Sequence, residues 1–138
     1  MREILFRGKT YNDKWVQGLL VQMDDHLTQI RKLGSDGIGY YDYSIVPSTV
    51  GQYTGLTDKN GKKIFEGDVL NVHDQIPMFD GYDTDEIIYN GKVMYIKNQG
   101  MYVCEGNNDG NALCALNLDK CEVIGNIHDN PELLEVTK

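Results

Sequence analysis

The side chains best suited to chemistry are the three histidines and the carboxylates near them in the sequence. His26 directly follows Asp24 and Asp25, and the other two histidines are His73 and His128. Imidazole nitrogens and carboxylate oxygens both bind divalent cations, so one hypothesis is a metal-assisted hydrolase that uses these residues. The competing interpretation of the first triplet is a solvated hairpin tip. Convergence of two histidines and two carboxylates on one cleft would favour the enzyme.

A second group of carboxylates is expected in a long acidic loop, residues 74–86, which also carries an apolar anchor at residues 76–79. The densest part of the loop consists of Asp80, Asp83, Asp85 and Glu86. Paired carboxylates can act as acid and base or bind a hard cation. Nothing nearby gives these groups contrasting environments, and carboxylates on a loop are usually solvated. The sequence therefore assigns no catalytic residue, no metal ligand and no cofactor site, and we expect a protein without enzymatic activity.

The other motif candidates fail on spacing. A calcium loop that begins at Asp58 would need glycine at position 6 and glutamate at position 12, but Gly61 falls at position 4 and Val69 at position 12. The segment GNNDGN, residues 106–111, matches neither a phosphate-binding loop nor a dinucleotide fingerprint. We expect it to be a turn.

The cysteines and the hydropathy pattern indicate the cellular compartment of the protein. The chain has three cysteines, Cys104, Cys114 and Cys121. Their number is odd and no two of them form a C-x-x-C pair, so we expect buried free thiols. No apolar run is long enough for a transmembrane helix, and no apolar stretch that could form a signal peptide follows the start of the chain. These features predict a cytoplasmic protein without a membrane partner.

Short strands separated by turns dominate the predicted secondary structure. Asn90-Gly91 predicts a type I′ turn, so residues 86–96 are expected to form a largely buried hairpin. The predicted strands are residues 4–7, 15–23, 27–33, 49–56, 62–65, 86–89, 92–95, 101–105, 113–117 and 121–127.

These elements predict a mainly β protein. The middle and C-terminal part is expected to be a small SH3-like barrel or a strongly bent antiparallel sheet, to which residues 4–33 add an N-terminal sheet. Asn130 predicts the N-cap of a short C-terminal helix that packs through Leu133 and Leu134. The 138 residues suit one domain, within which an N-terminal β subdomain (1–45) and a barrel-like part (46–138) can be distinguished.

Residues 50–70 carry three turn signals between apolar runs, and we expect the rest of the chain to be organised around them. Asn60 and Gly61 predict a tight turn, and Gly67 is expected at a left-handed or sterically crowded position. A β-branched residue at Gly67 should therefore unfold the protein, whereas Asp58→Ala should be mild. The structural signature consists of Gly51, Gln52, Tyr53, Thr54, Gly55, Asp58, Asn60, Gly61, Glu66, Gly67 and Asp68.

This signature, residues 49–56 (TVGQYTGL) and 58–69 (DKNGKKIFEGDV), resembles the centre of the YopX family of phage and prophage proteins. Residues 1–8 with Trp15-Val16 resemble the start of that family, and residues 122–134 resemble its end. The resemblance spans nearly the whole chain. It implies a mobile-element origin and a mainly β fold, and it brings no established activity and no catalytic residue.

The charge is unevenly distributed along the chain. Residues 1–70 hold nine basic and nine acidic side chains, whereas residues 71–138 hold four basic and twelve acidic ones. The whole net charge of −8 therefore lies in the second half of the chain. An acidic surface argues against nucleic-acid binding, which relies on lysine and arginine. It fits solubility, a basic protein partner, or imitation of a nucleic acid.

A tyrosine cluster is a candidate interaction surface. Tyr40, Tyr41 and Tyr43 follow a flexible loop, residues 34–39, and tyrosine is common where a ring is buried and its hydroxyl is wet. The competing interpretation is half-buried strand side chains. Exposed strand edges together with these tyrosines predict a homo-oligomer. The leading hypothesis is therefore a non-enzymatic accessory protein that binds to itself and to a host or phage protein.

Overall fold

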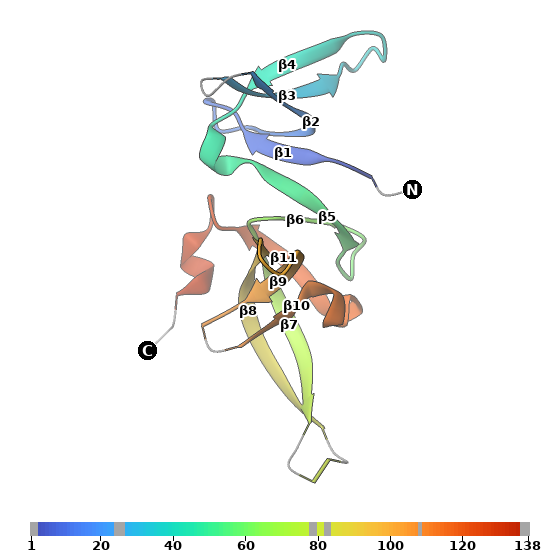
Figure 1. Ribbon diagram of the computed structural model, residues 1–138, viewed down its shortest axis with the longest axis vertical. Coiled ribbons are helices and arrows are strands. Elements are labelled where there is room, and N and C mark those ends of the chain that lie inside the picture. Colours follow the sequence, from blue (N-terminus) through green and yellow to red (C-terminus); the bar gives the residue numbers. More distant parts are fainter. Residues whose placement is uncertain (1–2, 24–26, 78–79, 82–83, 108, 136–138) are drawn as a thin grey trace. The chain divides into compact units, whose positions relative to one another are not determined.

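Antiparallel strands joined by short turns make up most of the chain in the computed structural model (Figure 1). The structure describes residues 3–23, 27–77, 80–81, 84–107 and 109–135. The chain divides into two compact units, Met1–Gly55 (unit 1) and Leu56–Lys138 (unit 2). The prediction of a mainly β fold is confirmed.

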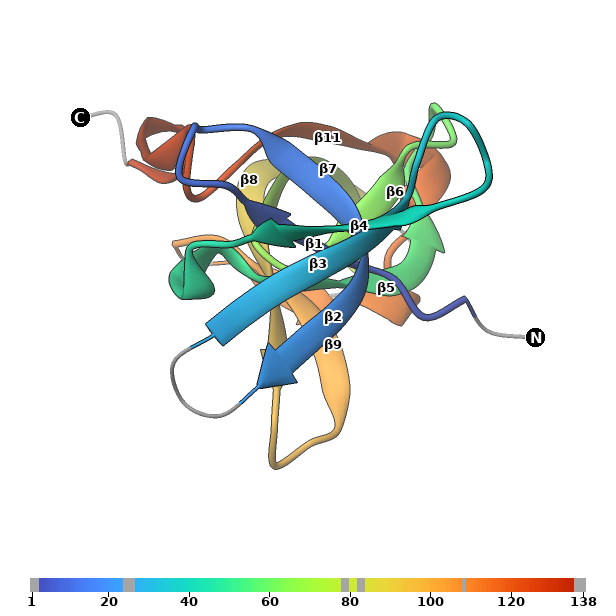
Figure 2. The same ribbon diagram turned by 90° about the horizontal axis from the view of Figure 1, so that it is seen from above.

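Unit 1 is a sheet in the order β4-β3-β2-β1-β5. Its strands are β1 (Phe6–Lys9), β2 (Trp15–Met23), β3 (Leu27–Leu33), β4 (Tyr40–Ser44) and β5 (Gly51–Thr57), and a 3₁₀ turn, η2 (Pro47–Thr49), precedes β5. Strands β2 and β3 lie side by side in Figure 2, with Met23 opposite Leu27. This register confirms the pairing that the alternating pattern of residues 15–33 predicted.

The core of unit 1 is small. Val16, Ile30 and Ile45 are buried there, and Phe6 and Val50 pack against them. A second hydrogen-bonded link joins η2 to β1, because the Thr49 hydroxyl accepts the Lys9 N–H at 2.8 Å and donates to the Val46 carbonyl at 2.6 Å. The turn that leads into β5 is therefore attached to β1.

Unit 2 contains a five-stranded antiparallel sheet in the order β10-β9-β8-β7-β11. Strand β6 (Lys63–Phe65) comes first and is the neighbour of β5, which runs on into this unit. The strands of the sheet are β7 (Asp68–Pro77), β8 (Thr84–Ile96), β9 (Met101–Glu105), β10 (Gly110–Ala112) and β11 (Cys121–Asn126). Three 3₁₀ turns complete the unit, η3 (Leu113–Ala115), η4 (Leu118–Lys120) and η5 (Pro131–Leu134).

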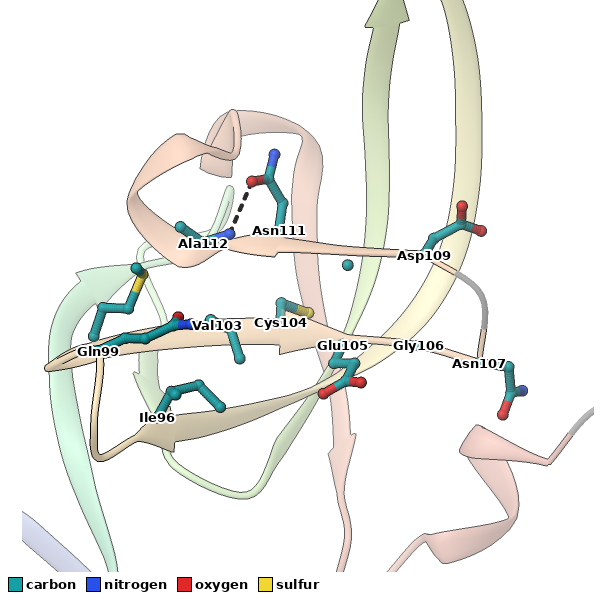
Figure 3. Close-up of a pocket in the computed structure, with 12 residues that line it drawn as sticks. Ile96, Gln99, Val103, Cys104, Glu105, Gly106, Asn107, Asp109, Asn111 and Ala112 are labelled. Carbon is teal, nitrogen blue, oxygen red and sulfur yellow. Dashed lines mark hydrogen bonds between the residues drawn. The ribbon is translucent and has the colours of Figure 1, made fainter.

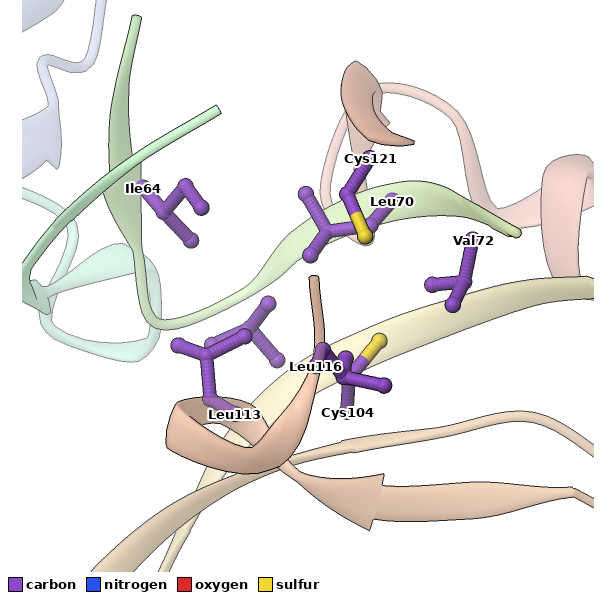
Figure 4. Packing of buried hydrophobic residues seen from close by; sticks show 8 residues of the cluster. Ile64, Leu70, Val72, Cys104, Leu113, Leu116 and Cys121 are labelled. Carbon is purple, nitrogen blue, oxygen red and sulfur yellow. The ribbon is translucent and has the colours of Figure 1, made fainter. Parts of the chain in front are cut away.

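One apolar cluster holds unit 2 together (Figure 4). Its buried members come from β6, β7, β8, β9, η3 and β11 and the segments beside them, and they are Ile64, Leu70, Val72, Val93, Cys104, Leu113, Leu116 and Cys121. Strands β10 and β11 are the edges of the five-stranded order, and no pairing between described residues closes that sheet. The antiparallel sheets are thus confirmed, but the predicted SH3-like barrel is not.

The prediction of a hairpin at Asn90-Gly91 is wrong. Strand β8 continues through both residues, pairs with β7 along its whole first part, and pairs with β9 from Lys92 to Ile96. Two long-range ladders thus outweigh the local turn preference of Asn-Gly. A glycine is needed here for another reason, because a Cβ at Gly91 would lie only 2.7 Å from the Cys104 sulfur.

Other element boundaries also differ from those predicted. The acidic loop is shorter than residues 74–86, since β7 extends to Pro77 and β8 begins at Thr84. Strand β9 pairs with β10 and not with the predicted strand 113–117, whose first three residues form the 3₁₀ turn η3. The C-terminal helix is one 3₁₀ turn, η5, and the Asn130 side chain does not cap it but accepts the Asn126 N–H at 3.3 Å. Within the described residues, no helix is long and apolar enough to cross a membrane.

The signature segment forms two consecutive turns around a buried carboxylate. Asp58 is 5% exposed, and its carboxylate accepts N–H groups from Asn60 and Lys62 within its own turn and from Val123 on β11, each at 2.9 Å. The Lys59 N–H also donates to the Cys121 carbonyl at 3.0 Å. Asp58 therefore joins the turn after β5 to a strand 65 residues further along the chain.

The second turn is built on Gly67 and Asp68. Gly67 has φ +89°, which confirms the predicted left-handed conformation. Its N–H donates to the Val93 carbonyl and its carbonyl accepts the Ile127 N–H, both at 2.8 Å. The buried carboxylate of Asp68 accepts the Phe65 N–H at 2.8 Å. The remaining signature residues lie on β5 or in these turns, where Tyr53 and Thr54 are buried.

These contacts reverse the expectation that Asp58→Ala is mild. The variant should lower the free energy of unfolding by about 2 kcal/mol. It leaves the Val123 N–H without its acceptor, and the turn loses the hydrogen bonds from Asn60 and Lys62. Chemical denaturation measures the change. A loss below about 0.5 kcal/mol would contradict a structural role for this carboxylate.

The same carboxylate predicts a pH dependence. Burial raises the pKa of Asp58, but the hydrogen bonds from Val123, Lys62 and Asn60, with the charge of Lys62, outweigh burial and hold the pKa below its ordinary value of 3.8. A depressed pKa stabilises the fold above 3.8, and that contribution is lost as the pH falls through the folded-state value. The stability difference between the native protein and Asp58→Asn should shrink on acidification, whereas a constant difference would rule the linkage out.

Gly67→Val should destabilise the protein by at least about 1 kcal/mol, because a β-branched residue is strained at positive φ. Gly39→Val is the matched control, since a Cβ at Gly39 meets nothing within 4 Å and the backbone there is not left-handed. Thermal melts compare the two variants. Equal, near-native melting temperatures would show that the turn does not require glycine.

Candidate functional site

A two-stranded arm extends from the sheet of unit 2 (Figure 1). Strand β11 pairs with β7 only as far as Val72, and β9 pairs with β8 only from Lys92 onward. Residues 73–77 of β7 and 84–88 of β8 pair only with each other among the described strands, and we call this ribbon the arm. A two-stranded ribbon has no core of its own, so both of its faces are presented to solvent or to a partner.

Both faces of the arm combine carboxylates with apolar side chains. In the register, Ile76 lies opposite Asp85 on one face, while Ile88 lies on the other face with Glu86. Ile88 is 59% exposed and Ile76 38% exposed. The chain contains no lysine or arginine between Asn71 and Gly91. The arm is therefore acidic along its length and partly apolar.

A hydrogen-bond chain runs along one face of β7 and β8 and ends at η5. The carboxylate of Glu86 contacts His73 Nδ1 at 2.9 Å, and His73 Nε2 contacts the Asn71 side-chain oxygen at 3.1 Å. The Asn71 amide donates to the Asn90 oxygen at 3.1 Å, and the Asn90 amide donates to the Leu133 carbonyl at 3.1 Å. A carbonyl only accepts, so this end fixes the direction of both amides.

The direction of the chain defines what His73 does. Asn71 presents its oxygen to Nε2, and the Glu86 carboxylate presents an acceptor to Nδ1. Both ring nitrogens of His73 therefore have a hydrogen-bond partner. His73 thus holds Glu86 against the base of the arm, and this chain connects the arm to the C-terminal turn.

The structure brings few of the predicted metal ligands together. His73 lies beside Glu86, but the described ranges contain no group of three or more His, Cys, Asp or Glu side chains that could hold a metal ion. Asp24, Asp25 and His26 lie outside the described residues, as does Asp83. His128 follows β11, and its N–H donates to the Asn126 side chain at 3.0 Å. The hydrolase hypothesis therefore has no third ligand among the described residues.

A pocket with a volume of about 630 Å³ lies against β9 and β10 (Figure 3). Its lining combines apolar groups such as Val103 and Ala112 with the carboxylates of Glu105 and Asp109. The thiol of Cys104 also lines it, but burial and the nearby Cys121 raise its pKa to about 12. That thiol stays protonated at neutral pH and is a poor nucleophile.

The predicted tyrosine cluster lies on the edge strand β4. Tyr40, Tyr41 and Tyr43 are 67%, 52% and 39% exposed. The register places Tyr43 opposite the buried Ile30, whereas Tyr40 lies opposite Leu33 on the other face of the sheet. The three rings therefore do not form one surface, because alternate strand residues point to opposite faces.

Sequence reasoning missed the arm and its hydrogen-bond chain. The predicted acidic loop, residues 74–86, includes carboxylates that lie on β7 and β8 in the structure. The polar residues Asn71, His73 and Asn90 are separated by up to nineteen positions, and only the register of β7 on β8 brings them together. An alternation of polar residues at 71, 73 and 75 was the one local signal available.

Comparison with known proteins supports the fold. Residues 5–135 match the model of a protein family described as YopX protein, which confirms the resemblance inferred from the sequence. The chain is also similar to the crystal structure of protein EF1440 from Enterococcus faecalis, with 24% identity and a TM-score of 0.50 over 98% of this chain and 100% of that one. This identity indicates a shared fold. No curated protein matches the chain.

The cysteines give a test of the core. Cys104 and Cys121 are buried as predicted, with the pKa of each thiol raised by burial, but Cys114 is exposed, which corrects the prediction for that residue. A thiol reagent should therefore label one cysteine in the native protein and three after denaturation. Cys114→Ser should abolish the native labelling. Rapid reaction of a second thiol under native conditions would contradict the packing of unit 2.

Proposed function

Because the chain belongs to the YopX protein family, we propose that it is a non-enzymatic phage or prophage accessory protein that acts in the bacterial cytoplasm by binding another protein. The observation that carries this proposal is the arm. A ribbon without a third strand or a covering layer contributes little to the stability of unit 2, so its length is better explained by binding than by folding. Membership of the family implies no particular activity, so the proposal rests on the arm.

The chemistry of the arm defines the partner class. Asp74, Asp85 and Glu86 lie on it, Asp80 and Asp83 belong to the segment that joins its strands, and no basic side chain lies between Asn71 and Gly91 to neutralise them. Ile76 and Ile88 add apolar contact area within the acidic surface. A basic protein surface with an apolar centre complements this combination, whereas the phosphates of a nucleic acid would be repelled.

A basic groove that normally holds nucleic acid is one surface of this kind, so imitation of a nucleic acid remains the alternative function. Both candidate functions use the arm, but only a mimic of nucleic acid would occupy the site at which its partner binds nucleic acid. Duplex DNA competes with the protein for a groove that binds nucleic acid, but not for an unrelated basic surface. Competition with DNA during capture of the partner distinguishes them.

The proposal is tested by neutralising the arm. We expect Asp80→Asn, Asp83→Asn, Asp85→Asn and Glu86→Gln together to weaken retention of a host protein at least tenfold, and the native interaction to weaken steeply with salt, since screening shortens to about 8 Å at physiological ionic strength. Retention on immobilised protein over a salt series measures both effects.

A matched variant controls for net charge. Asp109→Asn, Asp119→Asn, Glu132→Gln and Glu135→Gln remove the same number of charges from exposed positions of unit 2 outside the arm. This variant should retain the partner almost as well as the native protein. Equal loss in both variants would mean that overall charge, not the arm, drives retention, and binding of the native protein to duplex DNA would show that the partner class is wrong.

A further inference from the structure

One face of the sheet in unit 1 is more apolar than an open sheet face should be. The cross-strand pairs Met23–Leu27 and Leu33–Tyr40 point to the side opposite the buried Ile30, and Leu19 lies on that same side. We call this side of β2, β3 and β4 the outer face, and the three strands that form it are seen in Figure 2. Antiparallel sheets with one solvated face usually alternate apolar-in with polar-out.

The exposure of these side chains is large. Leu19, Met23, Leu27, Leu33 and Tyr40 are 54%, 60%, 39%, 47% and 67% exposed. Single apolar side chains on a surface are ordinary, but five on one face of three strands are more than an open sheet face usually carries. The outer face is therefore a candidate interface.

An ion pair lies within this patch. The Arg31 guanidinium donates to both carboxylate oxygens of Asp42, through Nε at 2.8 Å and Nη2 at 3.1 Å. In the register, Leu19, Arg31 and Asp42 form one row, with the Leu33–Tyr40 pair on one side and Val21, Met23 and Leu27 on the other. The outer face is thus apolar at both ends and carries one positive and one negative group between them.

We propose that the outer face binds the outer face of a second copy of this chain, about a twofold axis that lies between the two sheets and runs along the strands between β3 and β4. This axis sets β3 of each copy against β4 of the other, so that Arg31 meets Asp42 and Leu33 meets Tyr40, and the charge pattern complements itself. Strand β4 is the edge of the sheet, so β2 lies at the rim of this contact. Two sheets packed face to face lie about 10 Å apart, which is within reach of an arginine and an aspartate.

The charge of the whole unit agrees with this occupant. Unit 1 holds six basic and six acidic side chains, whereas unit 2 holds seven basic and fifteen acidic ones. Association through unit 1 is therefore not opposed by its own net charge, but association through the acidic surface of unit 2 would bring like charges together. The inference uses none of the arm, so it and the proposed function fail separately.

Charge reversal at the ion pair tests the proposal. Arg31→Asp and Asp42→Arg should each be monomeric, because each places like charges against each other across the axis, while an equimolar mixture should form a heterodimer. A chain that carries both changes should dimerise like the native protein and has the same net charge. Light scattering and sedimentation measure the masses, with the native protein at twice 15.6 kDa.

The apolar part of the face is tested with a matched pair. Leu27→Ser with Leu33→Ser, which lie on β3 within the contact, should raise the dimer dissociation constant at least tenfold, whereas Ile4→Ser with Tyr11→Ser, which alters more exposed side chains outside β2, β3 and β4, should leave it unchanged. Circular dichroism confirms that each variant is folded. A native protein that stays at 15.6 kDa at every concentration overturns the proposal, as does a dimer that neither charge reversal weakens.

Discussion

The structure of unit 2 depends on the buried carboxylate of Asp58. Its three backbone hydrogen bonds fix the turn before β6 and attach that turn to β11, which is the far edge of the five-stranded sheet. A buried charge is costly unless it is fully hydrogen-bonded, and here the backbone supplies the donors that outweigh burial. Asp58 therefore adds a link to β11 beyond the pairing of that strand with β7.

The second turn, at Gly67 and Asp68, is held by hydrogen bonds in a similar way and is attached to β8. The Gly67 N–H binds the Val93 carbonyl, and its own carbonyl binds the Ile127 N–H, so the second turn is connected to the centre of the sheet and to the end of β11. The apolar cluster around Leu70, Val72 and Val93 then fills the space that these turns define. Because these turns are hydrogen-bonded to other strands, the contacts of Asp58, Gly67 and Asp68 are structural.

Two surfaces differ in chemistry in a way that suits different partners. The outer face of unit 1 belongs to a unit without net charge and is apolar around one ion pair, whereas the arm of unit 2 is acidic and lacks any nearby lysine or arginine. A face without net charge whose charge pattern complements itself suits a copy of the same chain, and an acidic ribbon suits a basic protein. The hydrogen-bond chain from Glu86 to Leu133 supports the base of the arm, so this ribbon is anchored to the end of the chain.

The sequence alone determined the features that depend on neighbouring residues: the mainly β class, the pairing of residues 15–23 with 27–33, the left-handed Gly67 and the absence of any cysteine pair. Backbone φ and strand alternation are local properties, so local patterns predict them. Only the tertiary structure decided that Asn90-Gly91 continues a strand, that Asp58 binds Val123, and that the exposed apolar side chains of unit 1 share one face. Each of these depends on the register between distant segments, and a shift of one residue in register would move every side chain of a strand to the other face of its sheet.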